Sequence, residues 1–194
     1  MRKLFLASFF FMGVSLAYAQ ESKFGFIVGF NLSTIGGDSE GVRPKVGYQF
    51  GVMSLLALND EFSIQPELVF SNQGTHSKSD PKIRFNYGYI NFPLLLRYQK
   101  KDLSFVIGPQ LGVLINTKIV NKLANDKQTI IGQLNNLDVS ISLGFEYDIN
   151  IQMGVSTRLN LGLTNASANS NFEGDFLNRS LQLSYYYFFK SKSE

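Results

Sequence analysis

Alternation of apolar and polar residues runs through most of this chain, and it limits the possible folds more than any other feature. From Leu137 to Tyr147 every second residue is aliphatic or aromatic, and the residues between them are Asp, Ser, Gly and Glu. A period of two belongs to extended strands, whose successive side chains point to opposite faces. We count eight such segments, at about residues 24–33, 46–58, 61–72, 83–98, 102–116, 137–148, 150–164 and 177–189.

The connections between these segments are alternately short and long. The short ones are Asn59-Asp60, the link 99–101 and the link 148–150, and they contain residue types that hairpin turns use. The long, polar ones are residues 34–45, 73–82, 117–136 and 165–176. An up-and-down meander with this pattern has all tight turns at one end, as outer-membrane barrels do. The sequence predicts an all-β fold, an eight-stranded antiparallel up-and-down transmembrane β-barrel.

The polar faces of the strands indicate which side is inside. They are rich in Ser, Asn, Gln and Gly, and only 17% of the whole chain is charged, whereas a solvated exterior carries many Lys and Glu residues. A narrow lumen needs such small, mutually satisfied polar groups. We expect a lumen network of Glu67, Arg97, Asp138, Glu146 and Arg158 that plugs the barrel. We expect Ile64, Leu68, Val139, Ile141, Leu143, Leu161 and Leu183 to face lipid.

Tyrosines near the strand ends predict interfacial girdles. Tyr98, Tyr147, Tyr185 and Tyr187 lie near the tight turns, and Tyr87 or Tyr89 would serve at the other end.

Residues 1–19 are predicted to be a cleaved signal peptide. A basic start at Arg2 and Lys3 is followed by an apolar run and by Ala17-Tyr18-Ala19 before Gln20. The apolar run is shorter than the ~20 residues of a spanning helix. Residues 20–194 are then a single exported barrel domain.

Composition excludes several kinds of chemistry. There is no Cys, so disulfides, thiol catalysis and thiolate metal sites are absent, and no phosphate-loop or metal-ligand cluster is present. Without Arg2 and Lys3, 16 basic residues face 15 acidic ones, so we expect no nucleic-acid partner, no cofactor and no metal. The single histidine, His76, lies beside Ser77 in the segment THSKSD, which we interpret as a polar loop without the rigid geometry that a hydrolase needs.

Several segments resemble the PorT-like outer-membrane β-barrel proteins of Bacteroidota. They are PELVFSNQG (66–74), YINFPLLLRY (89–98), GPQLGVL (108–114), DVSISLGFEY (138–147) and SLQLSYYYFF (180–189). The resemblance implies an integral protein of a Gram-negative outer membrane, inserted by the barrel assembly machinery. It also implies that Phe188 and Phe189 act as the C-terminal assembly signal, and it carries a possible link to secretion.

The expected function is therefore non-enzymatic: a structural, secretion-accessory or surface-interaction role. Expected partners are outer-membrane lipid and lipopolysaccharide, whose anionic groups Lys118, Lys122 and Lys127 of the longest loop could contact. Two alternatives stay open. One is an outer-membrane lipid hydrolase that depends on His76, and the other is a soluble periplasmic lipocalin-like carrier with an apolar cavity.

Overall fold

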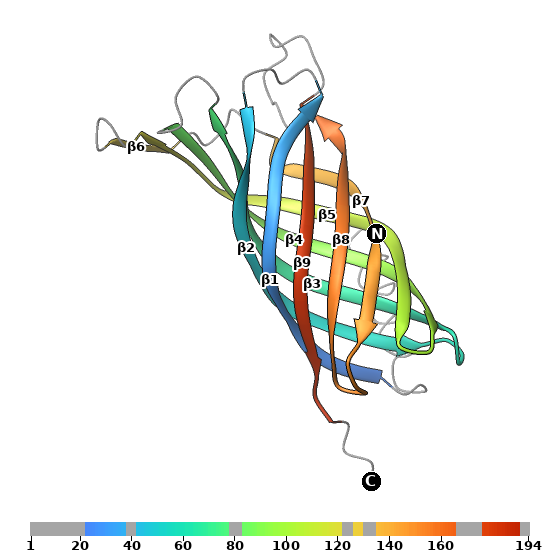
Figure 1. The fold of residues 1–194 in the computed structure, drawn as a ribbon. Coiled ribbons are helices and arrows are strands. Elements are labelled where there is room, and N and C mark those ends of the chain that lie inside the picture. Colours follow the sequence, from blue (N-terminus) through green and yellow to red (C-terminus); the bar gives the residue numbers. More distant parts are fainter. Residues whose placement is uncertain are drawn as a thin grey trace, which may run out of the picture.

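The structure is a computed structural model that describes residues 22–37, 42–77, 83–121, 126–129, 135–165 and 176–190. No helix within these ranges is long and apolar enough to cross a membrane. The described residues form nine strands, each antiparallel to its neighbours. They are β1 (Ser22–Gly37), β2 (Val42–Ala57), β3 (Phe62–Ser77), β4 (Ile83–Lys100), β5 (Leu103–Asn121), β6 (Asp126–Thr129), β7 (Leu137–Asp148), β8 (Met153–Asn165) and β9 (Phe176–Phe188) (Figure 1).

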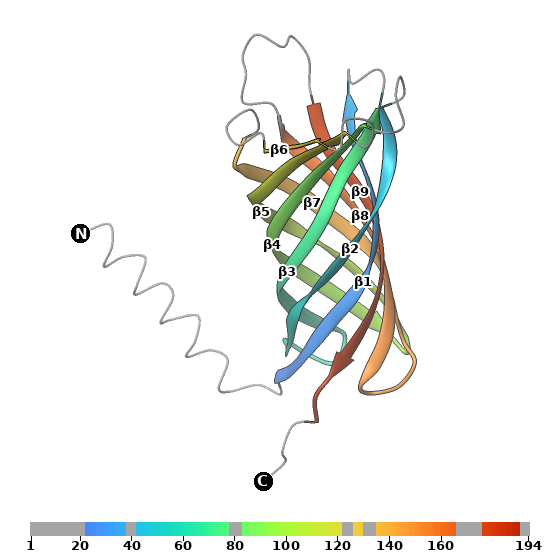
Figure 2. The same ribbon diagram turned by 90° about the vertical axis from the view of Figure 1, so that its left-hand side faces the viewer.

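Eight of these strands close into a barrel because the two ends of the sheet pair with each other. The order is β4, β3, β2, β1, β9, β8, β7, β5, and a further pairing joins β5 back to β4. Figures 1 and 2 show the strands tilted across the barrel wall. Closure leaves no unpaired sheet edge in the wall, which is the condition for a sheet in hydrocarbon. The predicted eight-stranded antiparallel barrel is confirmed.

The strand β6 lies outside this ring. It pairs with residues 118–121 at the tip of β5, above the barrel wall (Figure 2). The sequence prediction assigned residues 117–136 to a loop, so β6 and the end of β5 correct it. The alternation of apolar and polar residues stops near residue 116, whereas the backbone pairing of β5 continues to Asn121. The alternation therefore could not show this part of the strand.

Other strands also run further at this end than the alternation predicts. β1 continues to Gly37 and β3 to Ser77, and β2 begins at Val42. The ladder between β2 and β3 shifts register between Pro44 and Gln49. There the Nζ of Lys45 donates hydrogen bonds to Asn72 Oδ1 at 2.8 Å and to the carbonyl oxygen of Gln73 at 3.2 Å. The Lys45 side chain thus satisfies one backbone carbonyl oxygen and one side-chain amide oxygen beside the register shift.

The opposite end is formed by tight turns in which asparagine side chains cap the backbone. Asn59 Oδ1 accepts hydrogen bonds from the backbone N–H groups of Glu61 and Phe62, at 3.0 and 2.8 Å. Asn150 Oδ1 accepts in the same way from Gln152 and from the residue after it. Asn favours such turns because its short side chain replaces a backbone acceptor. The predicted placement of the tight turns at one end agrees with this geometry.

The two faces of the wall are inverted relative to a water-soluble protein. Large apolar side chains on the outside are exposed, with Phe30 at 67% and Leu183 at 62%, while Gln65, Ser71 and Ser104 inside are fully buried. An apolar exterior with a polar interior is the pattern of a barrel whose solvent is hydrocarbon.

Two features of the lumen differ from the sequence prediction. Tyr87 and Tyr89 are buried inside the barrel, at 6% and 3% exposure, so neither forms the predicted outer girdle. An apolar cluster of Ile27, Met53, Leu55, Val69, Tyr186 and Phe188 also fills the lumen toward the tight-turn end. Both follow from parity, because these residues occupy inward positions of their strands.

Candidate functional site in the lumen and at its mouth

An arginine on β8 joins two glutamates in the middle of the lumen. Arg158 Nη1 donates to Glu67 Oε2 on β3 at 2.7 Å, and Arg158 Nη2 donates to Glu146 Oε1 on β7 at 2.5 Å. In the ring of eight, three strands separate β3 from β8 in either direction. The contact between Arg158 and Glu67 therefore crosses the full width of the lumen.

A second arginine continues the network toward the tight turns. Arg97 on β4 lies with its Nη1 3.6 Å from Glu146 Oε2, and its Nη2 donates to Asp148 Oδ2 at 2.6 Å. Its Nε donates to Ser104 Oγ at 2.9 Å. Arg97 is only 1% exposed, so its charge is stabilised by these partners and not by water.

Three carboxylates meet two guanidinium groups here, which leaves one formal negative charge in excess. Neutral donors surround that charge. The amide of Gln65 donates to Glu67 at 2.8 Å and to Glu146 at 3.0 Å. The amide of Gln99 and the hydroxyl of Tyr186 both donate to Asp148. Hydrogen bonds of this kind stabilise a buried carboxylate.

Asp138, the fifth predicted member of the network, lies elsewhere in the lumen. Its Oδ1 accepts a hydrogen bond from Asn178 Nδ2 at 2.8 Å, and the same amide donates to Tyr89 Oη at 3.2 Å. Asn178 on β9 and Tyr89 on β4 are also on opposite sides of the ring. Asp138 therefore belongs to a separate contact that crosses the lumen near the long-loop end. Asp148 takes the position in the charged network that the sequence predicted for Asp138.

The signal that would have found Asp148 was present in the sequence. Asp148 continues the even-numbered inward positions of Asp138 and Glu146, but its position beside the turn led us to place it in the connection. Tyr186 continues the inward positions of Gln182 and Ser184 in the same way. In the run from Tyr185 to Phe189 every residue is aromatic, so the alternation does not show that Tyr186 faces the lumen.

Neutral side chains fill the lumen between and beyond the charged contacts. Gln49 Nε2 donates to Ser184 Oγ at 2.7 Å, Asn31 to Ser71 at 3.2 Å, and Gln110 to Ser140 at 3.2 Å. A cavity beside Asp138 holds about 10 Å³, close to the space of one water molecule.

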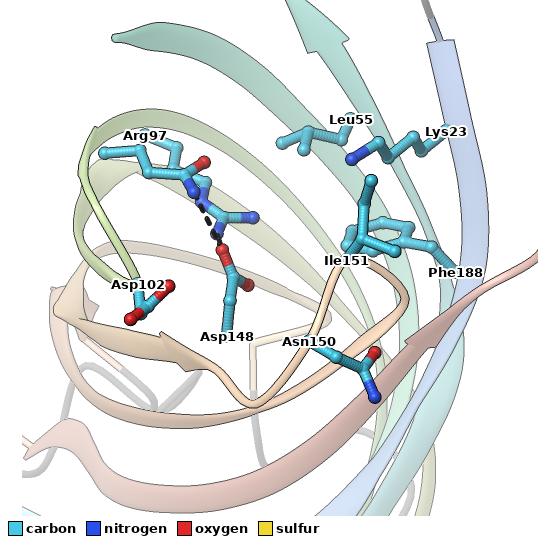
Figure 3. A pocket seen from close by; sticks show the side chains of 9 residues that line it. Lys23, Leu55, Arg97, Asp102, Asp148, Asn150, Ile151 and Phe188 are labelled. Atoms are coloured by element: carbon cyan, nitrogen blue, oxygen red, sulfur yellow. Dashed lines mark hydrogen bonds and ion pairs between the residues drawn. The ribbon is translucent and has the colours of Figure 1, made fainter.

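A larger cavity of about 260 Å³ opens at the tight-turn mouth (Figure 3). The ion pair of Arg97 and Asp148 lies in its wall, and Lys23 and Asp102 line it as well. The apolar side of this mouth includes Phe188. Arg97 and Asp148 contact each other, Arg97 also contacts Ser104, and Asp148 also accepts from Gln99 and Tyr186, so the charged network forms part of the wall of this cavity.

The residues predicted to face lipid are on the outer side of the wall. Leu68, Ile141 and Leu183 are exposed, and Ile64, Val139, Leu143 and Leu161 are half-exposed. Their contact with lipid stays a prediction. Val139 is nearer than Leu143 to the long-loop end of the outward run from Leu137 to Tyr147.

The two residues of the predicted assembly signal point in different directions. Phe188 ends β9 and is 2% exposed, with its ring centroid 5.6 Å from that of Tyr186 inside the lumen. Phe189 is exposed, packs beside Phe24 and donates its backbone N–H to the carbonyl oxygen of Phe24 at 2.8 Å. The first aromatic thus fills the interior and only the second lies on the outer wall.

The remaining sequence candidates do not gather into a catalytic or metal centre among the described residues. His76 lies within β3 and not in a loop, and its cross-strand partners are Arg43 and Arg84. No group of three or more potential metal ligands occurs in the described part of the chain. Lys118 is exposed at the end of β5, Lys127 lies in β6, and Lys122 is outside the described residues. The predicted signal peptide also lies outside them.

A closed barrel with an apolar wall and a plugged polar lumen defines a class, the small transmembrane barrels of the outer-membrane type. The chain matches the model of the outer membrane protein beta-barrel domain over residues 18–168, and it belongs to that family. It is thus an outer-membrane protein. The narrower resemblance to PorT-like proteins stays a prediction.

Solved structures with a similar fold have very different sequences. Neisserial surface protein A has a TM-score of 0.60 and 8% identity, covering 86% of this chain and 97% of that one. Ail, the attachment invasion locus protein of Yersinia pestis, in complex with the heparin analogue sucrose octasulfate, has a TM-score of 0.50 and 12% identity, covering 87% of this chain and 99% of that one. No curated protein matches the chain in sequence. At these identities the likeness shows the shared fold.

Proposed function

We propose that this protein is a non-catalytic, non-conducting barrel of a Gram-negative outer membrane that acts through its outer wall and its long-loop end. Its role would be structural, secretion-accessory or surface interaction. One observation carries the proposal: the ion pair of Arg158 and Glu67 bars the lumen at 2.7 Å between strands on opposite sides of the ring. Because the lumen is closed, we expect the protein to act through its outer wall and its long-loop end.

The plug has more than one layer, which supports a closed lumen. The contact of Asn178 with Tyr89 crosses the barrel toward the long-loop end, and Arg97 with Asp148 lies toward the tight turns. An eight-stranded barrel is wide enough only for side chains, and continuous water channels are a property of larger barrels.

The strands that rise above the apolar wall favour a surface role. β5 continues past the exposed apolar residue Ile115 to Asn121, and β6 pairs with its end. Such an ordered edge outside the hydrocarbon offers backbone and polar groups to a partner. We place the narrower PorT-like, secretion-accessory role of Bacteroidota proteins second, because it rests on the sequence resemblance.

The outer wall and the two ends of the chain bear on the lipid surroundings, the assembly signal and the signal peptide that we propose. The apolar exterior fits outer-membrane lipid as its surroundings, and lipopolysaccharide is the lipid partner that we propose. Phe189 is the exposed aromatic that the barrel assembly machinery would read, and cleavage after residue 19 would release the chain for export.

The two alternatives find less support in the geometry. A hydrolase that depends on His76 would have to work between Arg43 and Arg84, the cross-strand partners of this residue. A lipocalin-like carrier would need a dry apolar cavity, whereas the lumen of the described barrel is lined mostly by polar side chains.

Conductance in planar lipid bilayers tests the proposal. We expect no steady ion current from the purified protein, with a large porin as the positive control. The double variant Glu67→Ser and Arg158→Ser removes the bar and should raise the ion leak, whereas Ser140→Ala should stay silent. A steady current through the unmodified protein would contradict the proposal.

A further inference from the structure

Three basic residues form one row across neighbouring strands at the long-loop end. Arg43 on β2 pairs with His76 on β3, and His76 pairs with Arg84 on β4. Cross-strand partners lie side by side on one face of a sheet, and neighbouring strands are ~4.8 Å apart. The two arginines are therefore about 10 Å apart with the imidazole between them.

The row faces away from the lumen. Thr75, the residue before His76, is 1% exposed and fills the lumen, so His76 points to the opposite side of β3. Lys118 on β5 extends the row for the same reason. It follows the buried Thr117, it is exposed, and its strand position pairs with Asn86, two residues from Arg84.

Charge at this end is one-sided among the described residues. The described carboxylates at the long-loop end are Asp126 in β6 and Asp138, which faces the lumen and is held by Asn178. The Nε of Arg84 is buried and has no hydrogen-bond partner within the described part of the chain. An unsatisfied buried donor of this kind is explained by an ordered water or a bound ion.

The height of the row indicates which membrane component it meets. The outward apolar run of β3 ends at Phe70, and His76 is six residues further along, which is about 15 Å above the apolar edge for a strand tilted by roughly 40°. Arg43 and Lys118 are each three residues beyond an exposed apolar residue, Val46 on β2 and Ile115 on β5, which is about 8 Å above the edge. The row therefore spans about 8–15 Å above the apolar wall. Phospholipid headgroups occupy only about 5–8 Å on each side of the hydrocarbon. Phosphorylated sugars of a glycolipid reach higher.

We propose that Arg43, His76, Arg84 and Lys118 bind phosphate groups on the sugar core of outer-leaflet lipopolysaccharide. The inference rests on the proposed function, because it names the partner of the outward surface. Guanidinium groups bind phosphate in a bidentate manner, and the spacing of Arg43 and Arg84 allows each to hold a separate phosphate.

Binding to defined lipids tests the inference. The full-length protein is placed in phosphatidylethanolamine nanodiscs, and the apparent Kd for purified rough-type lipopolysaccharide is measured for the wild type and for Arg43→Gln with Arg84→Gln. We expect the double variant to bind at least about tenfold more weakly, since two charge-assisted hydrogen-bonding groups are lost. Dephosphorylated lipopolysaccharide should bind both proteins equally weakly.

A matched control removes two charges from the other end. Lys100 and Lys190 are exposed near the tight turns, and Lys100→Gln with Lys190→Gln should leave the Kd unchanged. Heat-modifiable migration on a gel checks that every variant is folded.

Three results would overturn the inference. They are equal losses in both double variants, an equal loss for phosphatidylglycerol, and preferential binding of soluble heparin fragments over lipopolysaccharide. The conductance test is independent of all three. If the unmodified protein conducts ions and the Arg43→Gln with Arg84→Gln variant loses affinity for lipopolysaccharide alone, the closed lumen is refuted and the proposed phosphate-binding row is supported.

Discussion

Arg158 and Glu67 form an ion pair of 2.7 Å although three strands separate β8 from β3 in either direction around the barrel. Both side chains are almost fully buried, and Arg158 also holds Glu146. One guanidinium thus fixes the distance across the lumen and satisfies two carboxylates. Its removal would leave two buried anions with too few partners.

Arg158→Ala should lower the free energy of unfolding by about 3–5 kcal/mol, the cost of leaving buried charges unpaired. Urea unfolding of the protein in phospholipid vesicles measures this value. Lys100→Ala is the control, because Lys100 is exposed at the rim and surface charges contribute about 0–1 kcal/mol. A loss for Arg158→Ala no larger than that of the control would show that the ion pair contributes nothing.

Leu143→Arg should cost about 2–4 kcal/mol, because Leu143 lies midway along the outward run of β7 and an arginine there enters the middle of the bilayer. Val139→Arg, nearer the long-loop end, should cost less. The same vesicle unfolding experiment measures both. Ser140→Ala, on the inward face between them, loses one hydrogen bond from Gln110 and should cost about 1 kcal/mol. Equal tolerance of both arginines would reverse the assignment of the faces.

Phe188→Ala and Phe189→Ala should separate stability from assembly. Phe188 is buried against Tyr186, so its truncation should cost about 3–5 kcal/mol in unfolding experiments. Phe189 is exposed, so its truncation should change stability little and should slow insertion by the assembly machinery. Folding rates in proteoliposomes with and without that machinery measure the second effect. Normal insertion of Phe189→Ala would remove it from the assembly signal.

Gly154→Ala should disturb the tight-turn mouth. A Cβ at Gly154 would overlap the ring of Tyr186 and the carbonyl oxygen of Tyr147. The ring would have to move, and its hydrogen bond to Asp148 would be lost. We expect a cost of about 1–3 kcal/mol, typical of overpacking, measured by vesicle unfolding.

Gly88→Ala is the matched control for that variant. The nearest atom to a Cβ at Gly88 is the Cβ of Asn116 at 3.3 Å, and no backbone atom is among its three nearest contacts. It should therefore be tolerated better than Gly154→Ala. The reverse order would mean that the glycines are needed for reasons other than space.

The faces and the turns could be read from the sequence because both are local. The side chain of residue 139 points away from that of residue 140 in any strand, so alternation separates wall from lumen without knowledge of the partner strands. The turns were visible for a similar reason, since Asn59 and Asn150 cap their own neighbours. The strand ends were misjudged at the long-loop end, because there the pairing continues beyond the apolar pattern.

Local patterns along the chain are enough to predict the barrel class, the number of strands in the wall and the inward parity of Glu67, Arg97, Glu146 and Arg158. The closed barrel is needed to show that Arg158 meets Glu67, that Asp148 and not Asp138 joins Arg97, and that Arg43, His76 and Arg84 share one row. The physical reason is that parity is fixed by the geometry of a single strand. The position of a side chain along the barrel axis, and the side chains that it meets, depend on how the eight strands are staggered when the sheet closes. No single segment of the sequence contains that information.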